Sequence, residues 1–291
     1  MDSTRLAKIS RTYDRHPLRA ATIVERLANT GRLSNLSEDD LATDDATFIT
    51  DQNHTGGLQA VVELARLVDL QRTDRVLDIG TGLGGTPRVL ADRYGCRCHG
   101  VELTTARYND AVELTRRVGL RHLVTFSYGD FLNVNFPQAP FNVIIGQDTF
   151  MHFEDLHAVL RKCSPLLATD GNLVIEDGFL RRAPATEIER SQLAAAWDQW
   201  NGRFPSLREW QNALRSCGFG VDRSDDRTDE AIMEYQLRMQ SLPQVDRRPE
   251  RHELSGWSLG EALMRSGVIG TMRILCRRQR SNLITPLNPS E

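Results

Sequence analysis

The sequence lacks the features that mark secreted, membrane and nucleic-acid-binding proteins. Its 291 residues include only five scattered cysteines, too few for a disulfide framework. No apolar run approaches the roughly 20 residues that span a bilayer, and the N-terminus has no signal-peptide core. A net charge of −3 argues against a general nucleic-acid surface. We therefore expect a cytoplasmic, metal-free protein without nucleic-acid or membrane partners.

The most informative segment is residues 76–85, VLDIGTGLGG. An apolar strand runs into Asp78, and three glycines follow at alternate positions, namely Gly80, Gly82 and Gly84. Glycine at such a turn lets the backbone approach a ligand closely. A helix is predicted to follow, with Thr86 as its N-cap and Pro87 at its first position, so that its free N–H groups face the ligand.

A second apolar strand, CRCHGVEL, carries Glu102 near its end, eighteen residues after the last of these glycines. A carboxylate at this place can accept hydrogen bonds from both hydroxyls of a ribose. The pattern predicts the nucleoside-binding half of a doubly wound sheet. Gly80, Gly82 and Gly85 also satisfy the dinucleotide spacing, so an NAD(P)-dependent oxidoreductase and a non-catalytic α/β module stay open as alternatives.

Strand and helix patterns alternate along the chain, which predicts an α/β fold with a doubly wound, mainly parallel, seven-stranded sheet. Strands are expected near residues 75–79, 97–102, 123–127, 141–146, 172–177, 219–224 and 268–277. Helices are expected within residues 1–30 and near 56–70, 87–94, 105–118, 154–167, 206–217 and 229–240. Residues 31–51 are polar and are expected to form a loop.

This pattern divides the chain into five segments: an N-terminal helical lid (1–55), a ligand-binding core (56–178), a lid insertion after strand five (179–205), the rest of the sheet (206–281) and a flexible tail (282–291). Both lids would cover the sheet edge where ligands of such folds bind. Three aromatic side chains of the insertion, Trp197, Trp200 and Phe204, are candidates for lining a substrate chamber. Plain helix packing is the alternative explanation for the spacing of Trp197 and Trp200.

The fourth strand ends in polar residues that suit acid–base chemistry. Asp148 and His152 stand four apart in QDTFMH, where they would face one cavity. A nearby carboxylate raises the pKa of a histidine, and such a pair could hold an amine or hydroxyl and accept its proton. The alternative is an aspartate that caps the following helix and a histidine bonded to backbone.

The glycine motif, Glu102 and the later Gly129-Asp130 together resemble the motifs of class I S-adenosylmethionine (AdoMet) methyltransferases. The segments NHTGGL (53–58) and QDTFMH (147–152) are similar to those of phosphoethanolamine and glycine/sarcosine N-methyltransferases. This resemblance covers roughly residues 50–280. It implies a Rossmann-like methyltransferase fold with an antiparallel last strand, and AdoMet as cofactor, with S-adenosylhomocysteine as product.

The resemblance also assigns roles to residues. Glu102 would hold the ribose and Asp130 the adenine amino group, while Tyr13 would pair with His152. The full set of cofactor-binding residues that it implies is Asp78, Gly80, Thr81, Gly82, Glu102, Leu103, Asp130, Phe131, Gln147, His54 and Thr55. Arg181 and Arg182 are the nearest candidates for a phosphate clamp, but the local sequence does not fix them.

The predicted function is methylation of a small molecule, with the amine of an amino-acid-like or natural-product metabolite as acceptor, as in antibiotic biosynthesis. Methyl transfer needs little acid–base chemistry, because a neutral amine attacks without a base and only a hydroxyl requires one. O- and C-methylation therefore remain alternatives. A homo-oligomer is also compatible with the sequence.

Overall fold

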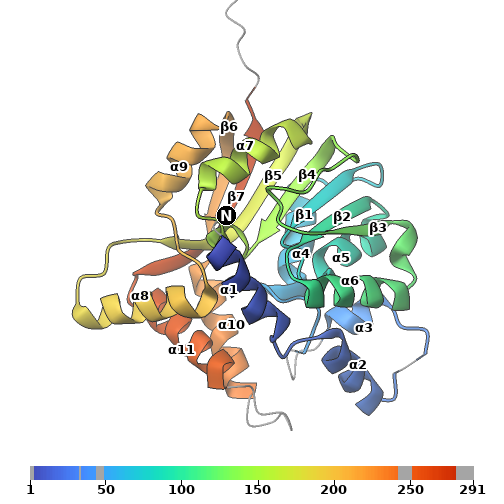
Figure 1. The fold of residues 1–291 in the computed structure, drawn as a ribbon, viewed down its shortest axis with the longest axis horizontal. Coiled ribbons are helices and arrows are strands. Elements are labelled where there is room, and N and C mark those ends of the chain that lie inside the picture. Colours follow the sequence, from blue (N-terminus) through green and yellow to red (C-terminus); the bar gives the residue numbers. More distant parts are fainter. Residues whose placement is uncertain (1–2, 33, 44–48, 242–250, 280–291) are drawn as a thin grey trace, which may run out of the picture.

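The computed structural model describes residues 3–32, 34–43, 49–241 and 251–279, and the predicted tail lies outside them. Its centre is a seven-stranded sheet in the order β3-β2-β1-β4-β5-β7-β6 (Figure 1). Strand β7 runs antiparallel to both neighbours, and the other pairs are parallel. This confirms the predicted fold class. The strands are β1 (Arg75–Ile79), β2 (Arg97–Glu102), β3 (Val124–Tyr128), β4 (Phe141–Gln147), β5 (Leu167–Leu180), β6 (Phe219–Asp226) and β7 (Ile269–Arg278).

Helices cover both faces of the sheet, as a doubly wound fold requires. Buried residues of β1, β4 and β5 alternate between two apolar clusters, so each face of the sheet has its own core. One cluster joins the sheet to α7 (Leu156–Leu166) and α9 (Leu207–Ser216). The other joins it to α4 (Gly57–Leu67) and α5 (Gly85–Tyr94). Helix α6 (Thr105–Arg117) packs beside the outer strand β3.

The other helices of the described residues lie beside or beyond these two clusters (Figure 1). They are α1 (Ser3–Asp14), α2 (Ala20–Asn29), α3 (Glu38–Ala42), α8 (Glu187–Trp200), α10 (Thr228–Ser241) and α11 (Arg251–Arg265), with short 3₁₀ turns at η1 (Leu120–His122) and η2 (Phe150–His152). Helices α8, α10 and α11 share an apolar cluster around Leu193, Ala231 and Leu263. The insertion after strand five is therefore one part of a helical layer that the C-terminal helices complete.

Two local predictions are wrong. Helix α5 begins at Gly85 with Gly84 as its N-cap, two residues before the predicted N-cap Thr86, because the left-handed Gly84, with φ of 76°, already ends the glycine turn. The hydroxyl of Thr86 instead donates to Gln147 Oε1 at 2.8 Å. Residues 31–51 are also not all loop, since Ser37 and Asp40 form a capping box that starts α3.

None of the helices that the structure describes is long and apolar enough to cross a membrane.

Candidate active site

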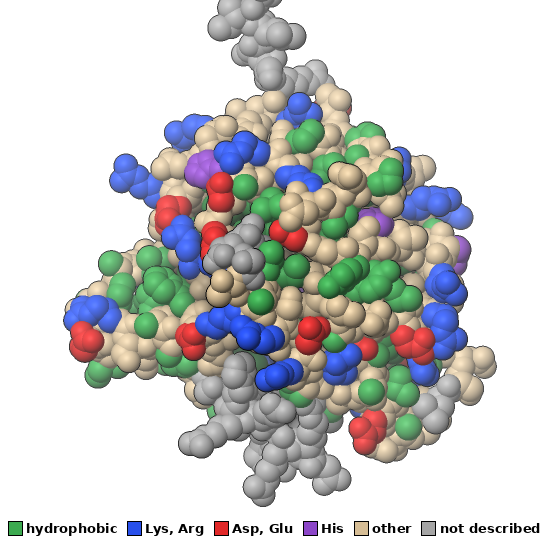
Figure 2. All heavy atoms as spheres, in the orientation of Figure 1, with side chains coloured by type: hydrophobic (Ala, Val, Ile, Leu, Met, Phe, Trp, Pro, Cys, Tyr) green, Lys and Arg blue, Asp and Glu red, His purple; other side chains and the backbone are tan. Residues whose placement is uncertain are grey.

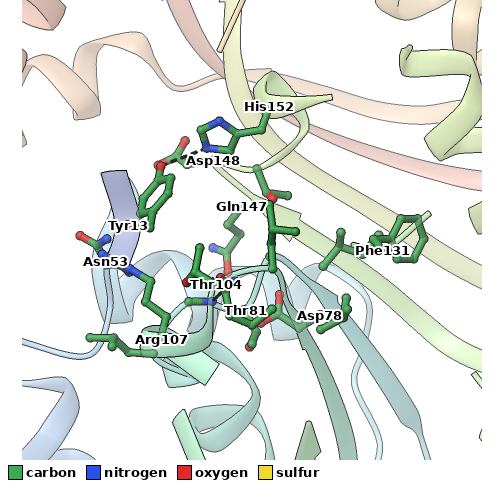
Figure 3. Close-up of a pocket in the computed structure, with 18 of the residues that line it drawn as sticks. Tyr13, Asn53, Asp78, Thr81, Thr104, Arg107, Phe131, Gln147, Asp148 and His152 are labelled. Atoms are coloured by element: carbon green, nitrogen blue, oxygen red, sulfur yellow. Dashed lines mark hydrogen bonds between the residues drawn. The ribbon is translucent and has the colours of Figure 1, made fainter. Parts of the chain in front are cut away.

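A pocket of about 990 Å³, its open mouth included, lies at the carboxyl ends of β1, β2 and β4 beneath α1 (Figure 3). It is lined by every predicted cofactor-binding residue except Thr55. The three predicted catalytic residues, Tyr13, Asp148 and His152, line the same pocket. The structure thus brings together residues that are up to 139 positions apart in the sequence. Figure 2 shows the face of the molecule on which α1 lies.

The glycine turn forms the floor of the pocket. Gly80 and Gly82 have φ angles of 70° and 56°, which favour glycine. A side chain at Gly80 would overlap Thr149, so this position of the turn requires glycine. The N–H of Gly82 donates to Glu102 Oε2 at 2.9 Å. This bond fixes the acidic strand end against the turn.

The carboxylate of Glu102 accepts hydrogen bonds from Thr104 as well as from Gly82. Its Oε1 accepts from the backbone N–H and the hydroxyl of Thr104, each at 2.8 Å. Burial raises the pKa of this carboxyl above its usual value. A carboxylate has about four acceptor positions, so three bonds leave one on Oε2, and the rotatable hydroxyl of Thr104 can release another. Glu102 can therefore still accept hydrogen bonds from a diol.

Two further acidic residues, Asp78 and Asp130, line the same part of the pocket. Burial raises the pKa of Asp78, at the end of β1, to about 7. The carboxylate of Asp130 stabilises its own turn by accepting from the backbone of Leu132 at 3.0 Å and the amide of Asn133 at 3.1 Å. Phe131 is buried and packs partly into the core, edge-on to Phe153. Asp130 and Phe131 therefore line the pocket from a turn that is stabilised by the hydrogen bonds of Asp130 and the packing of Phe131.

A polar chain links β4 to the segment that precedes α4. Gln147 donates to Glu176 Oε2 at 2.5 Å, while it accepts from Thr86. His54 Nε2 lies 3.4 Å from the same hydroxyl of Thr86. His54 and Gln147 line the pocket, so this chain positions two of the predicted cofactor-binding side chains.

Asp148 does not pair with His152, contrary to the prediction. It has a left-handed φ of 47°, and its Oδ2 accepts from the backbone N–H of Thr55 at 2.7 Å and from the Thr55 hydroxyl at 3.0 Å. It therefore anchors the loop before α4 to the end of β4. The expected rise in the pKa of His152 is also wrong, because burial lowers that pKa to about 4.

His152 instead pairs with Tyr13 of α1. The phenol oxygen of Tyr13 lies 3.0 Å from His152 Nε2, and Nδ1 lies 3.3 Å from the carbonyl oxygen of Asn201. Since a carbonyl can only accept, Nδ1 carries the ring proton and Nε2 accepts from the Tyr13 hydroxyl. Burial raises the pKa of Tyr13 to about 12. At neutral pH both groups are uncharged, and the lone pairs of the Tyr13 oxygen can accept from a ligand.

Arg107, in the first turn of α6, is a pocket residue that the sequence reasoning missed. Its guanidinium lies 5.0 Å from the centre of the Tyr13 ring. With its amide oxygen turned toward α6, Asn53 accepts from both terminal nitrogens at 3.0 Å. The available signal was its position five residues after Glu102, at the start of the helix that follows β2.

The predicted aromatic chamber is not part of this pocket. Trp197 is 40% exposed, and Trp200 and Phe204 pack with the α8, α10 and α11 cluster. Packing, the alternative interpretation, accounts for Trp200 and Phe204, and Trp197 is exposed. Neither arginine proposed as a phosphate clamp lines the pocket: Arg181 pairs with Asp226 and Arg182 with Glu189. Among the described residues, no cluster of His, Cys, Asp or Glu side chains could hold a metal ion.

Comparison with known proteins shows the family to which this chain belongs. A family model described as a methyltransferase domain matches residues 54–224. Phosphoethanolamine N-methyltransferase 1 of Arabidopsis thaliana is 27% identical over 199 residues, a match that spans 68% of this chain and 38% of that protein. A glycine/sarcosine/dimethylglycine N-methyltransferase of Actinopolyspora halophila is 32% identical over 123 residues, or 42% of this chain and 22% of that protein. The chain thus spans well under half the length of these two relatives.

A solved structure supports the fold independently. The geranyl diphosphate C-methyltransferase of Streptomyces coelicolor A3(2) superposes with a TM-score of 0.71 at 17% identity, over 95% of this chain and 98% of that one. At this identity the likeness concerns the fold alone. The sheet and its helices are those of the structural neighbours, as the sequence predicted.

Proposed function

The chain belongs to the methyltransferase domain family, and we propose that it transfers a methyl group from AdoMet to the amine of a small molecule that resembles an amino acid. The observation that carries the proposal is the shared pocket, in which the glycine turn and Glu102 form one end and the Tyr13–His152 pair forms the other. Family membership decides against the NAD(P) oxidoreductase alternative.

The residues present fit AdoMet. Glu102 keeps acceptor capacity for a ribose diol, and the left-handed glycines leave room beside it for a ligand. Asp130, Phe131, Gln147 and His54 also line the pocket. In this proposal Asp130 and Phe131 would contact the adenine, and Gln147 and His54 would contact the methionine part. When bound, AdoMet supplies an electrophilic methyl group on a sulfonium. This chain then needs to hold the acceptor nitrogen in line with that methyl group.

The other end of the pocket suits an acceptor that carries a proton. The Tyr13 hydroxyl donates to His152 and keeps free lone pairs, so it can accept a hydrogen bond from an N–H and orient the nitrogen lone pair. His152 is neutral at physiological pH and can take the proton that Tyr13 passes on. The same pair could deprotonate a hydroxyl, which makes O-methylation the second candidate.

Cofactor binding is the direct test. We expect S-adenosylhomocysteine to bind in calorimetry, and Glu102→Ala to weaken binding by about 1.5–3 kcal/mol through loss of charge-assisted hydrogen bonds. Glu113→Ala is the matched control, because Glu113 lies on the outer surface of α6 and pairs with Arg116 and Arg117. Unchanged affinity in a folded Glu102→Ala variant contradicts the proposal. An amine and amino-acid panel then identifies the acceptor.

The broader setting is also a proposal. The resemblance to N-methyltransferases of small metabolites supports a role in natural-product or antibiotic biosynthesis. Its test is methyl transfer to amine-bearing precursors of such products, followed by mass spectrometry. A cytoplasmic location remains a prediction from the sequence.

A further inference from the structure

Arg107 is a buried cation without a direct ion pair in the part of the chain that the structure describes. Its side chain lies in the pocket wall and the residue is 3% exposed. The Nε atom has no hydrogen-bond partner, and burial lowers the pKa of the guanidinium. Among the residues that the structure describes, Arg107 forms no ion pair. A buried charge of this kind is costly unless a ligand completes its interactions.

The neighbouring carboxylates are already engaged elsewhere. Asp110, one turn further along α6, pairs with Arg19 and accepts from the backbone of Ala20. Glu102 accepts from Gly82 and Thr104, as described above. The neutral amide of Asn53 and the face of the Tyr13 ring supply the direct contacts of the guanidinium. None of these contacts neutralises the charge.

The position of Arg107 indicates where its partner would lie. One terminal nitrogen comes within 3.3 Å of the place that a Cβ on Gly82 would occupy, so the guanidinium borders the glycine turn. Its other neighbour is Tyr13, whose hydroxyl marks the acceptor end. Arg107 therefore borders the glycine turn on one side and the Tyr13 ring on the other, next to Asn53 (Figure 3).

We propose that Arg107 is a carboxylate-binding residue of this pocket. The inference rests on the proposed function, because the carboxylate belongs either to the amino-acid part of the cofactor or to an amino-acid-like acceptor. A planar guanidinium suits the task, since it can donate two parallel hydrogen bonds to one carboxylate. A bound carboxylate would supply the direct ion-pair partner that no described residue gives Arg107.

The experiment compares ligands that differ in the carboxylate. S-adenosylhomocysteine carries the amino-acid part, and 5′-methylthioadenosine lacks it. Affinities of both are measured by calorimetry for the wild type, Arg107→Met and Arg107→Lys. Acceptors are tested in pairs, each an amino acid and the amine that remains without its carboxyl group. Arg116→Met is the matched control, because Arg116 is an exposed arginine of the same helix.

Two results support the proposal and identify the source. If the carboxylate is that of the cofactor, Arg107→Met weakens S-adenosylhomocysteine about tenfold or more, which is about 1.4 kcal/mol, and changes 5′-methylthioadenosine less than about twofold. If it is that of the acceptor, both nucleosides keep their affinity and the preference in kcat/KM for acid over amine falls about tenfold. In either case we expect the Arg107→Lys variant to show a loss between those of the wild type and Arg107→Met, because lysine keeps the charge without the paired donors.

Two results overturn it. In the first, Arg107→Met keeps the wild-type ratio of the two nucleoside affinities and the wild-type preference in kcat/KM for the amino acid over the amine. This result would show that Arg107 binds no carboxylate. Equal loss for both nucleosides shows a general collapse of the pocket. Urea unfolding checks folding, and we expect no loss of stability, because the substitution removes an unpaired buried charge. Failure of the wild type to bind S-adenosylhomocysteine would instead reject the proposed function.

Discussion

Two parts of the N-terminal segment are attached to the core by different interactions. Helix α1 is held by buried Ile9, by part-buried hydrogen bonds such as that of Tyr13, and by exposed ion pairs such as Lys8 with Asp198, whose side chains are 49% and 80% exposed. Glu38 and Asp51 instead surround Arg88 of α5, and all three side chains are at most 1% exposed. The ion pairs of the first attachment are exposed to water, whereas those of the second are part of the core.

This difference refines the prediction of a single lid over residues 1–55. Exposed ion pairs contribute little net stability, whereas removal of one partner of a buried pair leaves an uncompensated charge. We therefore expect α1 to open while Glu38 and Asp51 stay in place. Because α1 carries Tyr13 and Ile9 into the pocket, its opening would expose the acceptor end and leave the glycine turn intact.

The largest effect is expected from breaking the buried attachment. Arg88→Met should lower the free energy of unfolding by about 3–5 kcal/mol, because Glu38 and Asp51 lose the cation that balances them. Urea unfolding measures it. Arg93→Met is the matched control: Arg93 lies on the same helix and pairs with Asp39 on the surface, so a change within about 0.5 kcal/mol is expected. Similar small losses in both variants would remove the distinction.

The next effect concerns the contact by which α1 enters the site. His152→Ala should lower turnover about 10²-fold, the range of a lost general base, and leave S-adenosylhomocysteine binding nearly unchanged. Tyr13→Phe should show a smaller loss, because it removes the hydroxyl and keeps the ring. His99→Ala is the control, since burial also lowers the pKa of His99 to about 4, but its ring bonds Thr125 and Ser127 outside the pocket.

The pH profile sharpens this test. With a pKa of about 4, His152 is neutral from pH 6 to 9, so turnover should not fall as the pH drops through 6.5, the ordinary histidine value. Stability, unlike turnover, should depend on pH in this range because His152 is buried. The unfolded chain takes up the proton first, so the stability of the folded protein should fall as the pH drops from 6.5 toward 4. Full activity of His152→Ala would make the histidine structural.

The sequence could predict the features of the site that depend on neighbouring residues, but not those that depend on contacts between distant segments. The glycine turn and Glu102 are local, because each depends on a strand end and the residues that follow it. The partner of Asp148 is Thr55, 93 positions away, and no local pattern indicates that contact. The Tyr13–His152 pair came from a family resemblance alone. Arg107 was missed because an arginine near the start of a helix usually faces solvent.

Helix α11 shows how packing overrides local propensity. Gly256 and Gly260 lower the helix propensity of this polar segment, so the sequence did not indicate a helix there. In the structure a Cβ on Gly260 would lie 2.7 Å from the ring of Tyr235 in α10. The glycine therefore allows the two helices to approach closely, a requirement that appears only when both are in place.

The smallest effect is expected in hydrogen exchange, which tests the two attachments without mutation. With saturating S-adenosylhomocysteine, the amides of α1 should exchange about tenfold more slowly, because a ligand that binds the closed form suppresses local opening. Amides of α3 should already be protected and change little, since the Arg88 cluster holds Glu38 with or without ligand. Helix α9 packs on the face of the sheet opposite to α5 and serves as the internal reference. Equal slowing in α1 and α3 would mean that the whole segment closes as one lid, and no slowing in α1 would mean that Tyr13 is in place before the cofactor arrives.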